Sequence, residues 1–291
     1  MRMRTRVVNP SVFLKVAQAV EKLSKVCLLK FIPEKLHFIV ITDLEGGGVQ
    51  VWSQINSSSM FVDYRVESAH ENEIYLEIQL EYLLRALKSC IGSLDVNMKL
   101  TKRDGLPTLS FTIANQSRTG KEVLLTQDIP IKVLTPNQME TIKEPLVPEP
   151  QVHIMMPPLL SVRTIVERMR NISDHVIVSA NMNGEFTLKV ESEAVQVETF
   201  YKSLINPELD LSQVDASRQP SLNRDPEDFA HARIDIKNFI KFLHSYHVSP
   251  SNVVCCIIEG HALVLYVYVG GNNPNQDQYG VLTYYVPIKH S

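Results

Sequence analysis

The sequence has little of what marks zinc-binding or disulfide-rich proteins. Only four cysteines occur in 291 residues, and no two of them have the C-x-x-C spacing. Cys255 and Cys256 are adjacent, so on a strand they would face opposite sides. We therefore expect neither a zinc site nor a disulfide framework. A chain of this length can bury a core without them.

Targeting and membrane signals are also missing. The first ten residues carry three arginines and lack the apolar core of a signal peptide. No segment approaches the roughly 18 consecutive apolar residues that a membrane span needs. We therefore expect a soluble intracellular protein that has no membrane partner.

The motifs of common enzyme classes are absent as well. Gly120-Lys121 lacks the other residues of a phosphate-binding P-loop, and no G-x-S-x-G occurs. His244 and His247 are three residues apart, but no third ligand accompanies them, so no metal site is expected. The glycines at 46–48 are typical of a hairpin turn. The sequence therefore predicts no cofactor and no catalytic residues, although an unrecognised nucleic-acid enzyme, such as a nuclease, stays open as an alternative.

What the sequence does contain is a strand-rich globular pattern. Hydrophobic residues make up 44% and charged residues 21% of the chain, an ordinary globular composition. Most segments have the length and alternation of strands; in 108–114, for example, Phe111 and Ile113 alternate with polar residues. Four segments have helical spacing instead: Ser11–Lys25, Leu80–Cys90, Leu159–Asn171 and Lys237–Tyr246.

The order of these elements repeats after about half of the chain. The pattern predicts an α+β protein with two similar βαβββαβββ-type domains, over residues 1–135 and 151–291. Four prolines within 136–150 favour an extended, semi-rigid connector between the two domains. The second domain has a polar, proline-containing insert at 206–228, which we expect to be a loop.

Positive charge is concentrated on the four predicted helices. The whole chain has a formal charge of −3, but these segments hold ten basic and three acidic residues, a net of +7. The rest of the chain therefore carries −10. The basic residues are Lys15, Lys22, Lys25, Arg85, Lys88, Arg163, Arg168, Arg170, Lys237 and Lys241.

Two interpretations of these cations are open. Lysine-rich helix faces often serve only solubility. Four helices of the same sign inside an acidic chain instead favour a surface that follows a nucleic-acid backbone without reading bases. Aromatic residues are not interleaved on these faces, which argues against stacking on single strands.

Several sequence stretches resemble one known family. They are Asn72–Ile78, Leu84–Lys88, Asp128–Val133, Glu144–Pro150 and Met169–His175. In this order and spacing, they resemble the hydroxyurea-sensitive ("Hus-one") subunit family of the DNA-damage checkpoint sliding clamp, which has the PCNA-like DNA-clamp fold. The resemblance extends nearly from end to end of the chain.

The resemblance implies a non-catalytic protein of the nucleus. It implies a heterotrimeric ring with two homologous Rad-type clamp subunits, which a clamp loader places around double-stranded DNA without sequence specificity. Such a ring supports checkpoint signalling and serves repair enzymes as a platform. A homotrimeric replication clamp stays open as the alternative.

By position, the resemblance also implies two sets of site residues. Basic residues of the inner-ring helices would face DNA: Lys15, Lys22, Lys25, Arg85, Lys88, Arg163, Arg170, Lys237 and Lys241. The strands at 121–133 and 194–204 would be exposed edges that pair with neighbouring subunits. Their candidate contact residues are Glu122, Leu124, Leu125, Val195, Val197 and Phe200.

Overall fold

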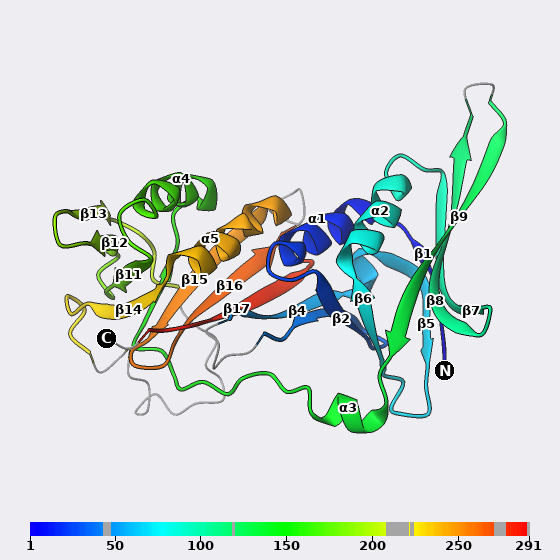
Figure 1. The fold of residues 1–291 in the computed structure, drawn as a ribbon, viewed down its shortest axis with the longest axis horizontal. Coiled ribbons are helices and arrows are strands. Elements are labelled where there is room, and N and C mark those ends of the chain that lie inside the picture. Colours follow the sequence, from blue (N-terminus) through cyan, green and yellow to red (C-terminus); the bar gives the residue numbers. More distant parts are fainter. Residues whose placement is uncertain (43–47, 118–119, 208–220, 222–223, 271–277, 290–291) are drawn as a thin grey trace. The chain divides into compact units, whose positions relative to one another are not determined.

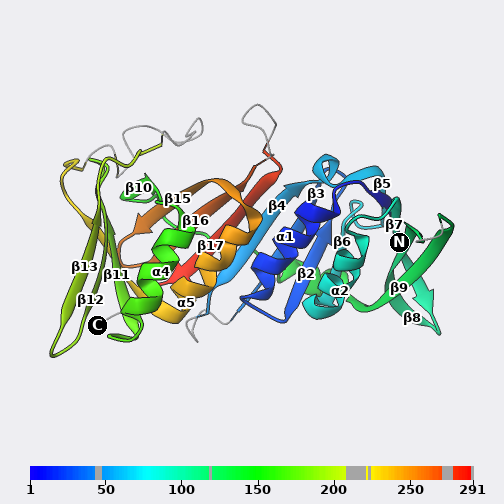
Figure 2. The ribbon, with the colours of Figure 1, turned by 90° about the horizontal axis from the view of Figure 1, so that it is seen from above.

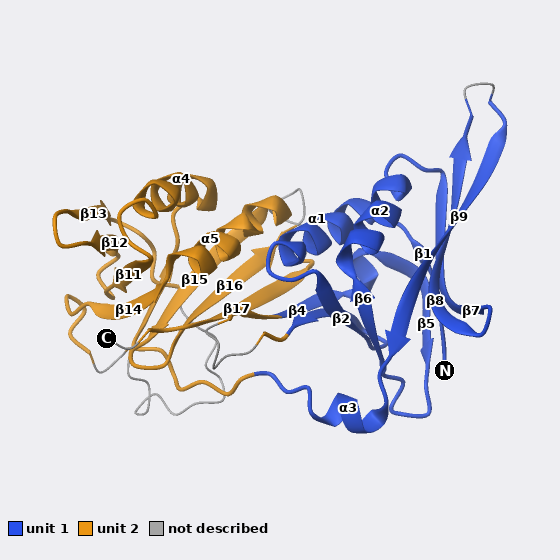
Figure 3. Cartoon of the chain, viewed as in Figure 1, with its two compact units in different colours: residues 1–40, 52–144 blue, residues 41–51, 145–291 orange. Residues whose placement is uncertain are grey.

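The structure is a computed structural model that describes residues 1–42, 48–117, 120–207, 221, 224–270 and 278–289. The chain forms two compact units (Figure 3). Unit 1 comprises residues 1–40 and 52–144, and unit 2 comprises residues 41–51 and 145–291. Most of the predicted glycine turn at 46–48 and of the polar insert at 206–228 lies outside the described residues.

Unit 1 is a sheet with the strand order β4-β3-β2-β6-β9-β8-β7-β1-β5 (Figure 1). Period-2 burial along β1, β2 and the first half of β7 gives these strands one apolar face. A short 3-10 turn at Ser57–Ser59 leads from β4 to β5. The strands are β1 Arg2–Val7, β2 Val26–Phe31, β3 Lys35–Val40, β4 Gln50–Asn56, β5 Phe61–Glu67, β6 Ile74–Gln79, β7 Asp95–Arg103, β8 Leu106–Gln116 and β9 Glu122–Val133.

Two helices, α1 (Pro10–Glu21) and α2 (Leu80–Cys90), lie side by side on that sheet (Figure 2). Phe13 of α1 is fully buried and meets the rings of Phe38 and Phe61 edge-on, each at 5.8 Å between centroids. Such aromatic contacts add to the free energy gained from area burial alone. The apolar faces of both helices therefore form the core of unit 1.

The first helix is shorter than the sequence analysis predicted. It ends at Glu21 rather than Lys25, because the amide groups of Leu23 and Ser24 both donate to the carbonyl of Val20 and close the last turn. Lys22 is the C-cap residue. Lys25 thus lies after the helix rather than on it.

Unit 2 contains the strand orders β10-β15-β16-β17 and β13-β12-β11-β14. Helices α4 (Leu159–Met169) and α5 (Ile236–Leu243) lie side by side on these strands (Figure 2). The predicted helix to Tyr246 continues beyond Leu243 only as a 3-10 helix, His244–Val248. The strands are β10 Val152–Met155, β11 His175–Ala180, β12 Phe186–Glu191, β13 Gln196–Tyr201, β14 Ala230–Asp235, β15 Pro250–Ile258, β16 Ala262–Val269 and β17 Gly280–Pro287.

The predicted connector is not extended throughout. Residues Pro136–Glu140 form the short helix α3, because Thr135 and Gln138 make a capping box and a proline occupies the first turn. Met139 of α3 is buried against Tyr75 and Leu134 of unit 1. Proline content alone therefore did not reveal that the first part of this segment is a docked helical turn.

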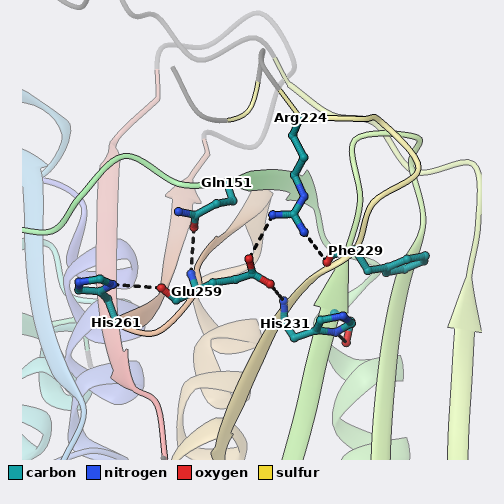
Figure 4. Close-up of polar contacts among 7 residues, drawn as sticks. Gln151, Arg224, Phe229, His231, Glu259 and His261 are labelled. Atoms are coloured by element: carbon teal, nitrogen blue, oxygen red, sulfur yellow. Dashed lines mark hydrogen bonds and ion pairs between the residues drawn. The ribbon is translucent and has the colours of Figure 1, made fainter. Parts of the chain in front are cut away.

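One carboxylate anchors the chain where it enters β14 (Figure 4). Glu259 accepts a hydrogen bond from the backbone N–H of His231 at 2.9 Å and pairs with Arg224 at 3.1 Å. The same guanidinium donates to the carbonyl oxygen of Phe229 at 2.6 Å, and Gln151 accepts from the amide of Glu259 at 2.9 Å. Since charge-assisted hydrogen bonds are stronger than neutral ones, this network fixes the start of β14 against β15.

The turn between β11 and β12 has five residues rather than a two-residue Asn-Gly turn. Asn181 is fully buried, and its side-chain oxygen accepts from the amides of Asn183 and Glu185. Gly184 has a φ of +76°, and a Cβ there would lie 2.4 Å from the carbonyl oxygen of Leu204. Only glycine therefore fits, and it lets the chain that follows β13 pack against this turn.

Replacing Gly184 with alanine should destabilise unit 2. Gly260 provides a matched control, because it has the same φ of +76° with open space where a Cβ would be. Gly260→Ala should cost only the left-handed backbone penalty of about 1–2 kcal/mol. Gly184→Ala should cost about 1–3 kcal/mol more, because the new methyl group collides with backbone. Urea unfolding measures both values, and equal losses would contradict the assigned clash.

Candidate nucleic-acid and subunit interfaces

The predicted cations of unit 1 lie on or just after its two helices. Lys22 and Lys25 are exposed and share one acidic partner, Glu21, at 3.3 and 2.5 Å. Partial burial would raise the pKa of Glu21, but the hydrogen bonds from both lysines outweigh it and lower the pKa overall. The bond to Glu21 in turn raises the pKa of Lys25. Glu21 thus stays ionised and brings the two lysines together, although Lys25 is outside the helix.

The second helix of unit 1 has one paired and one unpaired cation. Arg85 pairs with Glu81 at 2.9 Å, and its guanidinium lies 5.8 Å from the ring centre of Tyr82. Lys88 is exposed and makes no ion pair with any described residue. Lys15 of α1 is half-buried and has interactions of its own.

In unit 2 the predicted DNA-facing cations also divide into those with an acidic partner and those without one. Arg163 is held by two groups: it pairs with Glu167 at 2.7 Å and donates to the hydroxyl of Tyr246 at 3.1 Å. Only 23% of its side chain is exposed, so it is less available than the exposed cations of these helices. Lys237 is well exposed and lies 3.6 Å from Asp174. Within the described ranges, the exposed Arg168, Arg170 and Lys241 make no ion pair.

Each helix pair therefore presents a surplus of positive charge. All three helix acids, Glu21, Glu81 and Glu167, are already paired with a helix or cap cation. The remaining cations are diffuse and belong to no fixed hydrogen-bonded cluster. Such a surface can exchange counterions with a phosphate backbone without selecting a base sequence.

The predicted edge in unit 1 is the first nine of the twelve residues of β9. In the part of the sheet that the structure describes, residues Glu122–Pro130 pair with β8 alone, whereas Ile131–Val133 pair with β6 on the other side. The unpaired stretch exposes Val123 (50%), Leu124 (66%) and Leu125 (39%). An edge with free backbone groups and exposed apolar side chains is a template for pairing with another chain.

The predicted edge in unit 2 is the whole of β13. This strand is the outermost of the order β13-β12-β11-β14 and pairs only with β12 among the described strands. Phe200 is 61% exposed, and Val195, in the turn before the strand, is 48% exposed. Val197 is half-buried. It is therefore the least accessible of the three predicted contact residues in this region.

Two exposed apolar residues on the helices were missed by the sequence analysis. Tyr82 of α2 is 43% exposed and Leu160 of α4 is 58% exposed, although each belongs to a strongly amphipathic helix. A hydrogen bond of 2.9 Å from Gln127 of β9 to Ser89 links α2 directly to the edge strand. The sequence signal that could have identified Tyr82 and Leu160 is an apolar residue outside the buried stripe of its helix.

Two other site types, a metal centre and a membrane-spanning helix, are not found in the part of the chain that the structure describes. There, no group of three or more His, Cys, Asp or Glu side chains could hold a metal ion. None of the described helices is both long enough and apolar enough to cross a bilayer. The four cysteines are buried and unpaired.

Comparison with known proteins identifies both the family and the fold. A family model described as "Hus1-like protein" matches residues 1–289. "Checkpoint protein hus1" of Schizosaccharomyces pombe is 39% identical, with 98% of each chain covered. "Checkpoint protein HUS1" of Homo sapiens is 36% identical over 89% of this chain and 92% of that protein. The homologue of Dictyostelium discoideum is 34% identical over 99% of this chain and 98% of that protein.

A solved structure, PCNA from Thermococcus kodakaraensis, covers 99% of this chain and is covered completely, with a TM-score of 0.69 and 15% identity. At that identity it shows the fold alone, and the predicted sliding-clamp fold is confirmed. The checkpoint names of the relatives favour the predicted checkpoint clamp over a replication clamp. The chain belongs to the Hus1-like family.

Proposed function

We propose that the chain is a non-catalytic subunit of a heterotrimeric ring that encircles double-stranded DNA in the nucleus. Its two partners would be homologous Rad-type clamp subunits, a clamp loader would open and close the ring, and repair enzymes would be its clients. The observation that carries this proposal is the pair of helices in each unit whose apolar faces are buried and whose cations are left over.

The physical requirement of such a ring is weak, mobile attraction. Closure around DNA provides retention, so the inner surface needs positive charge that does not lock to any base. Exposed lysines and arginines without fixed partners meet this requirement, because each contact with a phosphate releases a counterion and is easily exchanged. We therefore assign the main role to Lys88, Arg170 and Lys241, with Lys22, Lys25, Arg85 and Lys237 in support.

The two other candidates, Arg163 and Lys15, would contribute less. The guanidinium of Arg163 is already engaged by Glu167 and Tyr246, so it would lose these bonds when it turned to DNA. Lys15 is half-buried. Their cost of rearrangement makes both of them weaker ligands for a phosphate than the exposed cations.

Neutralising the free cations should weaken DNA retention. The triple variant Lys88→Gln, Arg170→Gln, Lys241→Gln should flatten the slope of log K against log salt by up to about 0.9 for each contact removed. The control replaces Lys102, Lys143 and Lys289, exposed residues outside the helices, with glutamine. Retention of the loaded ring on circular DNA is measured against salt. Equal behaviour of the two variants contradicts the assignment of the helices to DNA.

Charged substitutions on the exposed edges should prevent assembly. Leu124→Asp and Phe200→Asp each place a charge where a neighbouring strand would pack, so co-purification with the two Rad-type subunits should fall by about tenfold or more. Leu106→Asp is the matched control. Leu106 is 67% exposed and lies at the start of β8, whereas Leu124 pairs with Ala114 near the end of that strand. Loss of assembly in the control as well would show a general effect of the new charge.

The oligomeric state of the isolated chain tests the ring composition. A chain that needs two different partners should be monomeric in light scattering and should form a ring only when both are added. A stable ring of three identical chains would instead support the replication-clamp alternative.

A further inference from the structure

A second cationic surface lies in unit 1 on strands that carry none of the helix cations. Arg2, Arg4, Arg65 and Lys99 are all exposed, and they belong to the adjacent strands β1, β5 and β7 (Figure 1). Together they line an open hollow of about 480 Å³, which also contains Glu67. This carboxylate is the one acidic residue among the described lining residues.

The register of the sheet brings these cations into a row. Arg4 lies directly opposite Arg65 on β5 and directly opposite Lys99 on β7. Residues opposite each other on neighbouring strands have Cα atoms about 4.5–5.5 Å apart. Three positive side chains therefore stand next to one another across three strands, with Arg2 two positions further along β1.

A bulge in β5 contributes to this placement. The pairing changes between Arg4–Arg65 and Arg6–Val62, so β5 has one extra residue there, and Asp63 adopts a φ of 51°. The extra residue reverses the facing of the strand: Phe61 points into the core, whereas Arg65 stays on the outer face. Without the bulge, Arg65 and Phe61 would face the same side of the sheet.

Glu67 lies directly opposite Arg2 on β5 and is the acidic neighbour of the row in the hollow, but no ion pair neutralises the cations among the described residues. Arg2, Arg4, Arg65 and Lys99 make no ion pair with any residue that the structure describes. Nearby outward-facing arginines differ in this respect, since Arg6 pairs with Asp95 and Arg103 pairs with Asp128. Like charges directly opposite each other destabilise a sheet. An anion bound between them would remove that repulsion.

This face is also separate from the helix surface. Met3, Val7 and Val66 of the same strands are buried, on the side where Phe61 meets Phe13 of α1. Because side chains alternate along a strand, the cation row faces away from α1. A duplex that lies against the helices would therefore lie on the opposite side of the sheet from this row.

From this geometry we propose that the outer face of β5-β1-β7 binds a phosphorylated serine or threonine in a partner peptide. A phosphate group carries close to two negative charges and three strong acceptor oxygens, so it can satisfy two guanidinium groups and an ammonium group together. A single carboxylate has one charge and two oxygens, and it would leave part of the row unsatisfied.

The surroundings favour a single phosphate over a nucleic-acid backbone. A duplex or single strand needs a continuous series of cations along its phosphates. Here the row is short, because Asp95 pairs with Arg6, the next outward-facing cation of β1, and Glu67 lies opposite Arg2 at the other end. A compact cationic hollow with acidic borders matches one phosphorylated side chain on an extended peptide.

Binding is tested with the full chain and two degenerate peptide pools, one with phosphoserine or phosphothreonine fixed at the centre and one with serine or threonine there. The phosphorylated pool should bind at least about tenfold more tightly, and enrichment from it should be selective. Equal binding of the two pools, or no binding of either, overturns the proposal. A fluorescent duplex and a single strand of DNA are measured beside them.

Variants assign the binding to this row. Arg4→Glu with Arg65→Glu should abolish selective capture of the phosphorylated pool. Lys143→Glu with Lys289→Glu makes the same change in net charge at exposed positions elsewhere and should leave it within about twofold. Arg4→Lys with Arg65→Lys keeps the charge but not the forked geometry and should give an intermediate loss. If the row variant loses DNA binding but retains phosphopeptide capture, the row is a nucleic-acid site and the proposal fails.

Inorganic phosphate provides a readout that does not depend on peptide sequence. It should raise the midpoint of thermal unfolding of the wild-type chain, because an anion that binds only the folded state stabilises it. The rise should be clearly smaller in Arg4→Gln with Arg65→Gln, which removes the row without adding negative charge. Equal rises in both proteins overturn the assignment of the site.

Discussion

Each unit depends on burying one face of a sheet under two short helices. Phe13 against Phe38 and Phe61 in unit 1, and Phe242 against Tyr284 at 5.2 Å in unit 2, are the contacts through which this happens. Because an amphipathic helix has only one apolar stripe, the rest of its surface is left to polar groups. In this chain the charged groups among them are mostly cationic, so the same packing that forms the core also sets the sign of the surface above it.

Much of this arrangement could be predicted from the sequence, because period-2 and helical patterns report burial directly. The helix Leu80–Cys90 has the predicted bounds, and the strand predicted at 121–133 is observed as Glu122–Val133. The predicted end of the first helix, Lys25, was too late, because sequence spacing cannot show that hydrogen bonds to the Val20 carbonyl close the final turn. Helix α3 was missed because four nearby prolines outweighed the capping pair Thr135 and Gln138.

The candidate site was predictable in kind but not in detail. Charge counting found which helices are basic, but not that Arg163 is held by Tyr246, a residue 83 positions away. Strand β1 was overlooked, although Arg2, Arg4 and Arg6 alternate with buried Met3, Thr5 and Val7. Its importance arises from register: only the pairing with β5 and β7 shows that three cations meet. The DNA-facing and subunit-contact residues stay predictions.

The half-paired strand β9 has a consequence for the cell. Its stretch Glu122–Ile129 offers free backbone groups and exposed Leu124 until another polypeptide covers them. A subunit synthesised in excess of its assembly partners would keep this edge strand exposed. Aggregation, or capture by chaperones and proteases, would then compete with assembly. The abundance of the chain should therefore follow that of its partners, through selective turnover of unassembled copies.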